Sequence, residues 1–294
     1  MEKSSRTTQV FLNILFVVLC ILFLIPFIML ISASFTDEKE IIMNGYNLWP
    51  RKFSLEAYKY VLRDPTAVVN AYKTTIIFSV VSMVLATLLM SMVAYPLTKR
   101  DLKGRTGLSF YLYFVTLFSG GMVPSYILIT QYLHLQDTIW VYILPGLISP
   151  WYVFMLRTFF QGLPDSITEA ALIDGASEYR IFFTIILPLS KPVLATIALF
   201  TFLGRWNLWW ESMLYINKRD DLVSLQYLLQ KIMRQITFLR ENSTVTLTED
   251  MAATLPSESV RMATAMLVAG PALVVFPFFQ KYFTRGLTVG SVKG

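Results

Sequence analysis

The sequence is poor in the residues from which most enzyme sites are built. It contains one cysteine, Cys20, and one histidine, His134, among 294 residues. A single cysteine excludes a disulfide framework and a paired-cysteine metal site, and a single histidine cannot make a metal centre alone. An integral membrane enzyme would need a convergent nucleophile, acid or metal set, which these two residues do not supply. We therefore expect a chain that is not an enzyme and binds no cofactor itself.

Charged residues are also scarce. They make up 15% of the chain, whereas soluble domains carry about 25%. Hydrophobic residues make up 55% and aromatic residues 15%, which favours a chain dissolved in lipid with rings at the two interfaces. The net charge of +6 would suggest nucleic acid in a soluble protein, but basic residues in membrane proteins mark cytoplasmic loops. We therefore expect a lipid bilayer, and no nucleic acid, around this chain.

Long apolar runs are what the sequence has in abundance. A membrane-spanning helix needs about 20 mostly apolar residues, and we count six such runs. The first could be a secretory signal peptide, but it is longer than the apolar core of such signals, so we interpret it as a retained span. We predict an all-α membrane protein with six transmembrane helices. The runs are 11–32, 74–97, 108–130, 139–160, 192–215 and 262–279.

The short loops predict the orientation of these spans. Lys99, Arg100, Lys103 and Arg105 lie between the second and third spans, whereas the link 131–138 has no basic residue except His134. Because Lys and Arg concentrate in short cytoplasmic loops, the first loop is inside and the second outside. Both termini are then cytoplasmic. The outer segments are expected to carry amphipathic helices near 53–62 and 222–239 and a mobile, Ser- and Thr-rich loop over 241–259.

The cytoplasmic loop 161–191 carries strong helix signals. Ser166 and Glu169 have the spacing of a capping box, which predicts a helix starting near residue 167. Gly175 can adopt the left-handed conformation that ends such a helix. Ser177 can cap a second helix, which Pro188 is expected to stop. The loop is thus predicted to form two short helices with a sharp turn between them.

The first of these helices could contact a partner protein. Ala170 and Ala171 allow close approach of another surface, while Glu169 and Asp174 can select a basic rim. An amphipathic pair resting on lipid headgroups is an equally simple alternative.

A longer motif in this loop resembles a known family signature. Glu169, Ala170 and Ala171 are followed at fixed spacing by Gly175, and then by the residues Ile185, Leu187 and Pro188. This pattern is similar to the EAA loop of the membrane subunits of bacterial ABC importers. Further stretches, at 53–58, at Asn70 and Tyr72 and at the C-terminal end, resemble the carbohydrate-uptake, maltose-type branch of these MetI-like permeases, and most closely those associated with oligosaccharides.

The resemblance implies a fold, partners and a location. It implies the core of a type I importer permease over 74–281, with a coupling helix in the loop 161–191 and an outer loop at 216–261. Residues 1–73 would add an N-terminal span and outer segment, and 282–294 a cytoplasmic tail. The implied partners are a homologous second permease subunit, two copies of an ATP-binding subunit and an extracytoplasmic solute-binding protein. The implied location is the bacterial cytoplasmic membrane.

The sequence has no Gly-x-x-x-x-Gly-Lys-Ser/Thr phosphate loop of its own. In the setting that the resemblance implies, ATP and Mg²⁺ would therefore be bound by the partner ATPase subunits and not by this chain.

Polar residues within the spans are candidates for a substrate path, because such groups face protein or water rather than lipid. The fifth span is expected to place Asn207 with Glu211 on one helical face, and Arg205 with Trp209 on another. Sugars offer hydroxyl edges and apolar ring faces, which suits this mixture; an interfacial aromatic belt is the alternative. In the third span, glycines could line a cavity or allow close helix packing. The candidate residues are Arg205, Trp206, Asn207, Trp209, Trp210, Glu211, Gly120, Gly121 and Tyr126.

Two other functions remain open from the residues alone. An ABC permease for a non-sugar solute would have the same loop, because specificity is encoded in the binding protein. An ion-coupled secondary transporter would also have several apolar spans, but it would not need the coupling loop. We expect carbohydrate import through half of a translocation pathway that works by alternating access.

Overall fold

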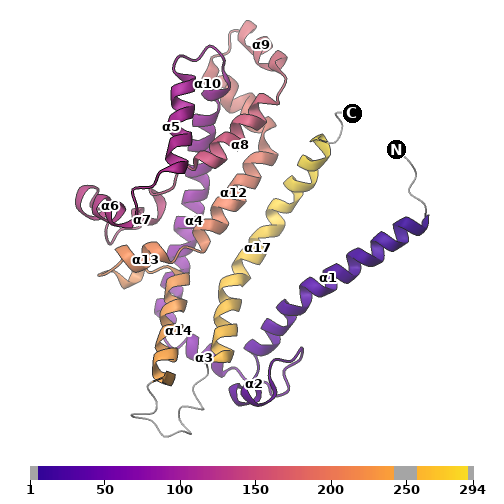
Figure 1. Ribbon diagram of the computed structural model, residues 1–294, viewed down its shortest axis with the longest axis vertical. Helices are drawn as coiled ribbons and strands as arrows, with labels where there is room; N and C mark the ends of the chain where they lie inside the picture. Colours follow the sequence, from indigo (N-terminus) through magenta and orange to yellow (C-terminus); the bar gives the residue numbers. More distant parts are fainter. Residues whose placement is uncertain (1–5, 242–256, 291–294) are drawn as a thin grey trace. The chain divides into compact units, whose positions relative to one another are not determined.

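The computed structural model describes residues 6–241 and 257–290, and every regular element within these ranges is a helix. This confirms the predicted all-α class; one isolated antiparallel bridge pairs Thr36 with Phe53. Figure 1 labels the helices. They are α1 (Arg6–Ser34), α2 (Glu38–Asn44), α3 (Glu56–Val61), α4 (Pro65–Ala94), α5 (Arg105–Leu117), α6 (Met122–Ile127), α7 (Trp140–Ile143), α8 (Pro150–Gln161), α9 (Asp165–Ile173), α10 (Glu178–Ile181), α11 (Leu187–Leu189), α12 (Lys191–Trp206), α13 (Trp210–Tyr215), α14 (Leu225–Glu241) and α17 (Glu258–Gly290).

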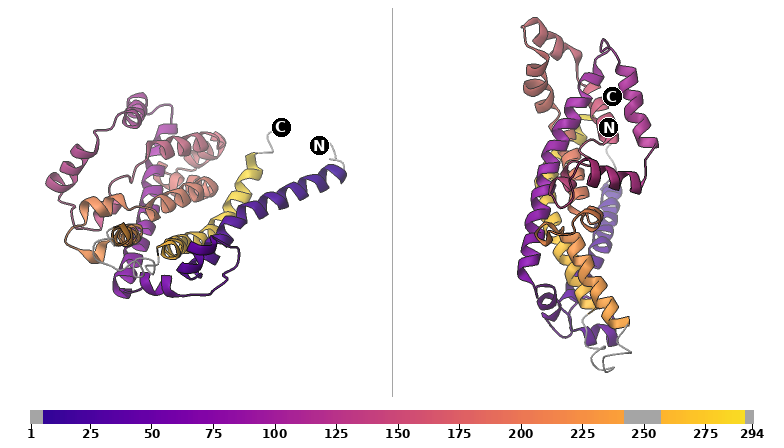
Figure 2. Two further views of the ribbon diagram at one scale, coloured as in Figure 1. Left: turned by 60° about the horizontal axis from the view of Figure 1, so that its bottom comes forward. Right: turned by 90° about the vertical axis from the view of Figure 1, so that its left-hand side faces the viewer.

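The chain divides into two compact units. One comprises Met1–Val68 with Leu228–Pro271, and the other comprises Val69–Tyr227 with Ala272–Gly294. The first unit begins with α1, a single 29-residue helix that is continuous in both views of Figure 2 (indigo). Its apolar side chains are exposed, Phe23 by 71%, as expected of a helix surrounded by lipid.

A buried carboxylate connects two distant parts of the chain in the first unit. Glu38, on α2, is 6% exposed. Its Oε2 accepts hydrogen bonds from the amide and hydroxyl of Ser259, at 2.8 and 2.7 Å. Its Oε1 accepts from the Glu258 amide at 2.9 Å and from the Ser257 hydroxyl at 3.1 Å. A carboxylate at a helix N-terminus satisfies amides that have no intrahelical partner, so Glu38 caps α17 from a distant part of the chain.

The second unit has a core formed by α4, α8, α10 and α12. Met90 of α4, Leu156 of α8, Ile181 of α10 and Ile197 of α12 belong to one cluster of buried side chains. A second cluster joins Phe78 to Tyr142, whose rings stack at 4.4 Å. These contacts hold α4 along the unit and leave α9 projecting at one end, beyond α10 (Figure 1).

Three continuous helices in the described residues are long and apolar enough to cross a membrane: Thr8–Ser34, Pro65–Thr98 and Glu258–Gln280. They correspond to the first, second and sixth predicted spans. Two bent pairs also qualify, Arg105–Leu117 with Met122–Tyr132 at 111° and Glu178–Leu189 with Lys191–Trp206 at 80°. The first pair coincides with the third predicted span, which is therefore bent, whereas the bend of the second pair falls at Ser190, before the fifth predicted span begins. The chain therefore has several apolar helices, and not all of the predicted spans are straight.

The fourth predicted span, 139–160, is wrong as a single helix. It consists of the four-residue α7 and the twelve-residue α8, separated by residues 144–149. Within this segment Gly146 has a φ of +79°, which is incompatible with a right-handed helix. Hydropathy alone does not reveal such a break.

The predicted amphipathic helices are present. The stretch near 53–62 forms α3, and the stretch near 222–239 forms α14, which begins after a 3-10 turn over Asp220–Leu222. Thr75 of α4 accepts the Leu225 amide at 2.9 Å and so fixes the start of α14. Most of the outer loop predicted at 241–259 lies outside the described residues.

Candidate functional site: the coupling loop and the broken fifth span

The first helix of the loop 161–191, α9, begins earlier than predicted. Its N-cap is Pro164, which makes no side-chain capping bond, and Asp165 is its first residue. The predicted capping box of Ser166 and Glu169 is therefore wrong: both residues already lie inside the helix. Proline presets a backbone suited to entering a helix, and Asp165 complements the positive end of the helix dipole.

The turn after α9 is built as predicted. Gly175 has a φ of +79°, the left-handed conformation that favours glycine. Its amide donates to the Leu172 carbonyl, and the Ala176 amide donates to the Ala171 carbonyl, both at 3.0 Å. This pair of bonds is a Schellman motif, which satisfies the last carbonyls of a helix. The turn brings α9 directly against the start of the next helix.

The second helix is capped as predicted but ends later. The Ser177 hydroxyl accepts the Arg180 amide, which starts α10. The helix then widens into a π-helical turn over Phe182–Ile186 and continues through Pro188 to Leu189, so the prediction that Pro188 stops it is wrong. A proline ring clashes with the carbonyl four residues before it in an α-helix, and a π-helical turn changes the bonding at that point.

The motif residues divide between an exposed and a packed group. Glu169, Ala170, Asp174, Gly175 and Pro188 are exposed, whereas Ala171, Ile185 and Leu187 are half-buried against the core of the second unit. No residue of α9 is buried. The helix therefore offers its first two motif residues to solvent, while the end of the motif anchors the loop.

Sequence reasoning missed the apolar part of this surface. Ile173 is 86% exposed and Leu172 46% exposed, both on α9. Large apolar side chains exposed on a short polar-flanked helix mark a contact surface. The sequence signal that could have shown this was the position of Leu172 and Ile173 inside the motif, on a helix that is too short to bury both side chains. A polar cavity of about 480 Å³ beside α9 is lined by residues that include Lys99, Arg100, Asp165, Thr168 and Glu169.

The fifth predicted span ends its regular helix at Trp206. The helix α12 is followed by Asn207 to Trp209 in non-helical conformations, and α13 starts at Trp210. The expected shared faces of Asn207 with Glu211 and of Arg205 with Trp209 are therefore wrong, because spacing by four residues places side chains together only within a continuous helix.

Arg205 holds the break in the fourth span. Its guanidinium donates to the Tyr142 carbonyl at 3.0 Å and to the Pro145 carbonyl at 2.6 Å. The first carbonyl belongs to α7 and the second to the segment that interrupts the helix, so a side chain replaces part of the lost backbone bonding. A Cβ atom on Gly146 would lie 2.7 Å from Arg205 Nη2. Glycine at position 146 therefore leaves room for the guanidinium.

The other candidate path residues differ in exposure. Trp206 is 1% exposed and stacks on Phe202 at 5.7 Å. Asn207 is exposed and donates to the Leu203 carbonyl at 2.9 Å. Trp210 is 41% exposed and meets Trp209 edge-on at 5.4 Å. Glu211 Oε2 is buried and has no hydrogen-bond partner among the described residues.

The glycines of the third span mark a break rather than close packing. Gly121 has a φ of +87°, and no atom lies within 4 Å of a Cβ placed there. Gly120 would meet only Pro124 Cβ, at 3.7 Å. The two glycines connect α5 to α6 at the 111° bend. Tyr126, on α6, stacks on Tyr215 at 5.7 Å, which joins this segment to the end of α13.

Comparison with known proteins shows the family to which the chain belongs. The family described as binding-protein-dependent transport system inner membrane component matches residues 74–289, which include the loop 161–191 and the interrupted third, fourth and fifth spans. The chain belongs to this family. The permease is a transport component and not an enzyme, as the sequence predicts.

Individual relatives agree with the family match. Protein LplC of Bacillus subtilis (strain 168) is 40% identical over 271 residues, which cover 92% of this permease and 90% of that protein. The polygalacturonan/rhamnogalacturonan transport system permease protein YtcP of the same organism is 36% identical over 282 residues, covering 96% and 95%. The arabinooligosaccharides transport system permease protein AraQ of Halalkalibacterium halodurans is 32% identical over 304 residues, covering 100% and 99%.

A solved structure has the same fold. The crystal structure of a bacterial ABC transporter involved in the import of the acidic polysaccharide alginate contains a chain that matches with a TM-score of 0.76 and 27% identity. The match covers 96% of this permease and 100% of that chain. The permease therefore has the fold of a MetI-like ABC importer permease, and the predicted family is confirmed.

Proposed function

We propose that this permease forms half of the pathway of an ATP-driven importer of oligosaccharides. The observation that carries the proposal is α9, which has no buried residue and exposes Glu169 and Ala170 in the family's signature loop. Relatives named for polygalacturonan, rhamnogalacturonan and arabinooligosaccharides support a plant-type glycan as the substrate class.

In this proposal the permease has six spans with both termini in the cytoplasm of a bacterium. Its partners are a homologous second permease, two copies of an ATPase subunit that bind ATP and Mg²⁺, and an extracytoplasmic binding protein. The coupling surface consists of Glu169, Ala170, Asp174 and the exposed apolar Ile173. Closure of the ATPase subunits on ATP would move α9, and the pathway would change the side of the membrane to which it opens.

The broken fifth span is the proposed substrate path. Asn207 and Trp210 are exposed at the break, and they offer an amide for sugar hydroxyls and an indole face for a sugar ring. Arg205 and Trp206 support them, since one guanidinium holds the neighbouring loop and the indole is buried. Trp209, Glu211, Gly120, Gly121 and Tyr126 complete the proposed path.

The test of the coupling surface is a pair of substitutions in the assembled complex. Glu169→Lys reverses a charge on α9, and Gly175→Val forces a β-branched residue into a left-handed turn. We expect both to prevent stable association of the ATPase subunits, measured by co-purification, and to abolish sugar uptake. Glu56→Lys, the same charge change at an exposed residue of α3, is the matched control. Unaltered sugar uptake in both loop variants would overturn the assignment of α9 as the coupling surface.

A further inference from the structure

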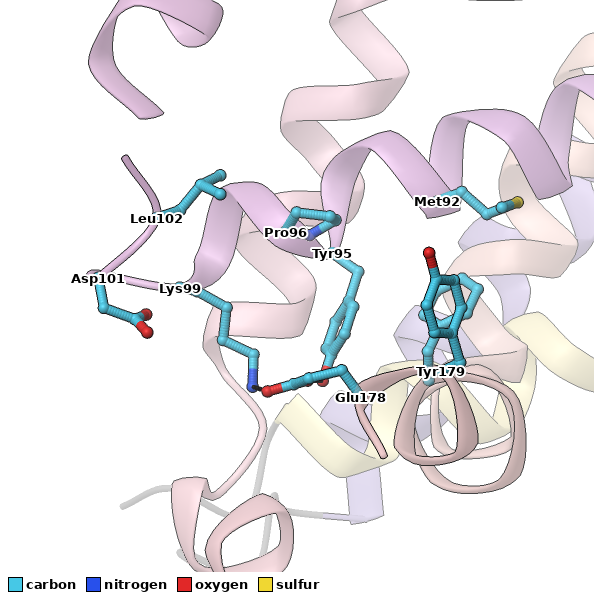
Figure 3. Close-up of a pocket in the computed structure, with 9 residues that line it drawn as sticks. Met92, Tyr95, Pro96, Lys99, Asp101, Leu102, Glu178 and Tyr179 are labelled. Atoms are coloured by element: carbon cyan, nitrogen blue, oxygen red, sulfur yellow. Dashed lines mark hydrogen bonds and ion pairs between the residues drawn. The ribbon is translucent and has the colours of Figure 1, made fainter. Parts of the chain in front are cut away.

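One carboxylate of the coupling loop, that of Glu178, bonds to the end of α4 and the segment after it. Glu178 is the first residue of α10. Its carboxylate accepts a hydrogen bond from Tyr95 Oη at 2.5 Å and forms an ion pair with Lys99 Nζ at 3.0 Å. Figure 3 shows Tyr95 and Lys99 converging on Glu178 from the end of α4 and the segment after it. Each carboxylate oxygen has one of these partners, so Glu178 bonds to both.

Tyr95 and Lys99 also contact each other, as well as Glu178. Lys99 Nζ lies 5.1 Å from the centre of the Tyr95 ring, within cation–π range. The same ring packs against Phe182 at 5.2 Å, one helical turn after Glu178. Tyr95 is 7% exposed. The ring is therefore fixed by packing, and its hydroxyl is held where Glu178 can accept from it.

The contact joins two elements that the chain connects only distantly. On one side, α10 follows α9 directly across the Gly175 turn. On the other side, α4 is 30 residues long, or about 45 Å at 1.5 Å per residue. At the far part of this helix, Thr74 donates to the Asp221 carbonyl and Thr75 accepts the Leu225 amide. A displacement of α10 that pulls on α4 therefore reaches the opposite end of the second unit.

The contact is also able to break and reform. The Lys99 side chain is 28% exposed and that of Glu178 is 49% exposed, and ion pairs with this access to water are weak. A cavity of about 430 Å³ lies beside the three residues and is lined by Met92, Asp101, Leu102 and Tyr179 among others. The open space lets Glu178 leave its partners without a clash.

We propose that Tyr95, Lys99 and Glu178 form a latch that transmits movement of α9 to α4 and is required for coupling ATP hydrolysis to import. The proposal rests on the proposed function. The three are positioning residues, because they act through α9 and α4 and do not contact the substrate.

The test measures ATP hydrolysed per sugar imported by the complete transporter, with its binding protein, in proteoliposomes. We expect Tyr95→Phe, Glu178→Gln and Lys99→Met each to raise this ratio by at least about fivefold, the scale of a modest coupling energy between sites. The double variant Tyr95→Phe/Glu178→Gln should have a ratio no higher than that of the more affected single variant, because both substitutions remove the same interaction. A structural role alone would lower hydrolysis and import together and leave their ratio unchanged.

Two variants serve as controls. Lys99→Arg keeps a cation at the latch and should retain a normal ratio. Tyr179→Phe removes a hydroxyl from the same cavity without touching the three residues and should also be normal. A normal ratio in Tyr95→Phe and Lys99→Met, in complexes that import sugar, would overturn the latch alone. If the unaltered complex imports no sugar with ATP, the proposed function and the latch are both overturned.

Discussion

Glu38 and Ser259 are 221 residues apart in the sequence, and both the amide and the hydroxyl of Ser259 donate to Oε2 of Glu38. The Oε1 atom of the same carboxylate accepts from Ser257 and from the Glu258 amide. One side chain of α2 thereby replaces the local cap that the long helix α17 would otherwise need.

We predict that Glu38→Gln destabilises the permease by about 2 to 4 kcal/mol, because hydrogen bonds to a charged acceptor are strong and buried donors would lose their partner. The glutamine amide would also place a donor against the amides of α17. Thermal unfolding of the purified protein measures the effect. Glu40→Gln, on the same helix, changes an exposed carboxylate that accepts from the Asn44 amide and should change stability by less than about 0.5 kcal/mol. Equal effects of the two substitutions would contradict the capping role.

The same carboxylate predicts a dependence of stability on pH. Burial alone raises the pKa of Glu38, but the hydrogen bonds from Ser259 and from the first turn of α17 outweigh it and hold the pKa below its ordinary value of 4.5. A lowered folded-state pKa contributes stability that is present above the unfolded pKa and is lost as pH falls through the folded pKa.

The measurement is the difference in unfolding free energy between the unaltered protein and Glu38→Gln. This difference should be constant from neutral pH down to about 4.5 and should shrink as the pH is lowered further. The neighbouring groups Tyr46, Glu258 and Arg261 are present in both proteins, so their shared titration is largely removed by the comparison. A difference that grows on acidification would show that the carboxylate is not the acceptor.

Gly146 and Arg205 are predicted to be energetically coupled. Gly146→Ala introduces a Cβ 2.7 Å from Arg205 Nη2 at a φ of +79°. The backbone strain alone costs about 1 to 2 kcal/mol, and displacement of the guanidinium from two carbonyls adds to it. Arg205→Ala removes the clash, so the double variant should be more stable than the sum of the single effects predicts, by at least about 1 kcal/mol. Additive effects in denaturant unfolding would contradict this arrangement.

Gly175 and Gly107 offer a matched pair for the turn after α9. Neither glycine has an atom within 4 Å of an added Cβ, but only Gly175 has a positive φ. Gly175→Ala should destabilise the loop by about 1 kcal/mol through backbone strain. Gly107→Ala, inside α5, should be neutral or stabilising by up to about 1 kcal/mol. Hydrogen exchange of the Ala176 amide, which closes the turn, measures the first effect directly. Equal protection of that amide in both variants would contradict the strain.

Local signals in the sequence were reliable where one residue acts on its own backbone. Gly175 ends α9 and Ser177 caps α10, because a left-handed turn and an N-cap depend on a few adjacent residues. The capping box at Ser166 failed because Pro164 and Asp165 start the helix earlier, a competition between neighbouring signals. Pro188 failed as a stop because the turn before it widens.

Longer-range features could not be predicted from apolar patterning. The fourth and fifth spans are both predominantly apolar, yet each contains a break. Breaks within a membrane are stable only where other groups satisfy the freed backbone, and Arg205 does so for carbonyls about 60 residues away. The sequence located this arginine but not its partners.

The sequence by itself determined the class of the protein, because scarce charge and long apolar runs leave only the membrane as solvent, and a spaced motif marks the loop. Only the tertiary structure decided which polar side chains form hydrogen bonds with distant parts of the chain. Glu38 is engaged by α17, Arg205 by the broken fourth span and Glu178 by the end of α4. The reason is physical: a buried polar group must find a partner, and that partner is chosen by proximity in space, which the order of residues does not specify.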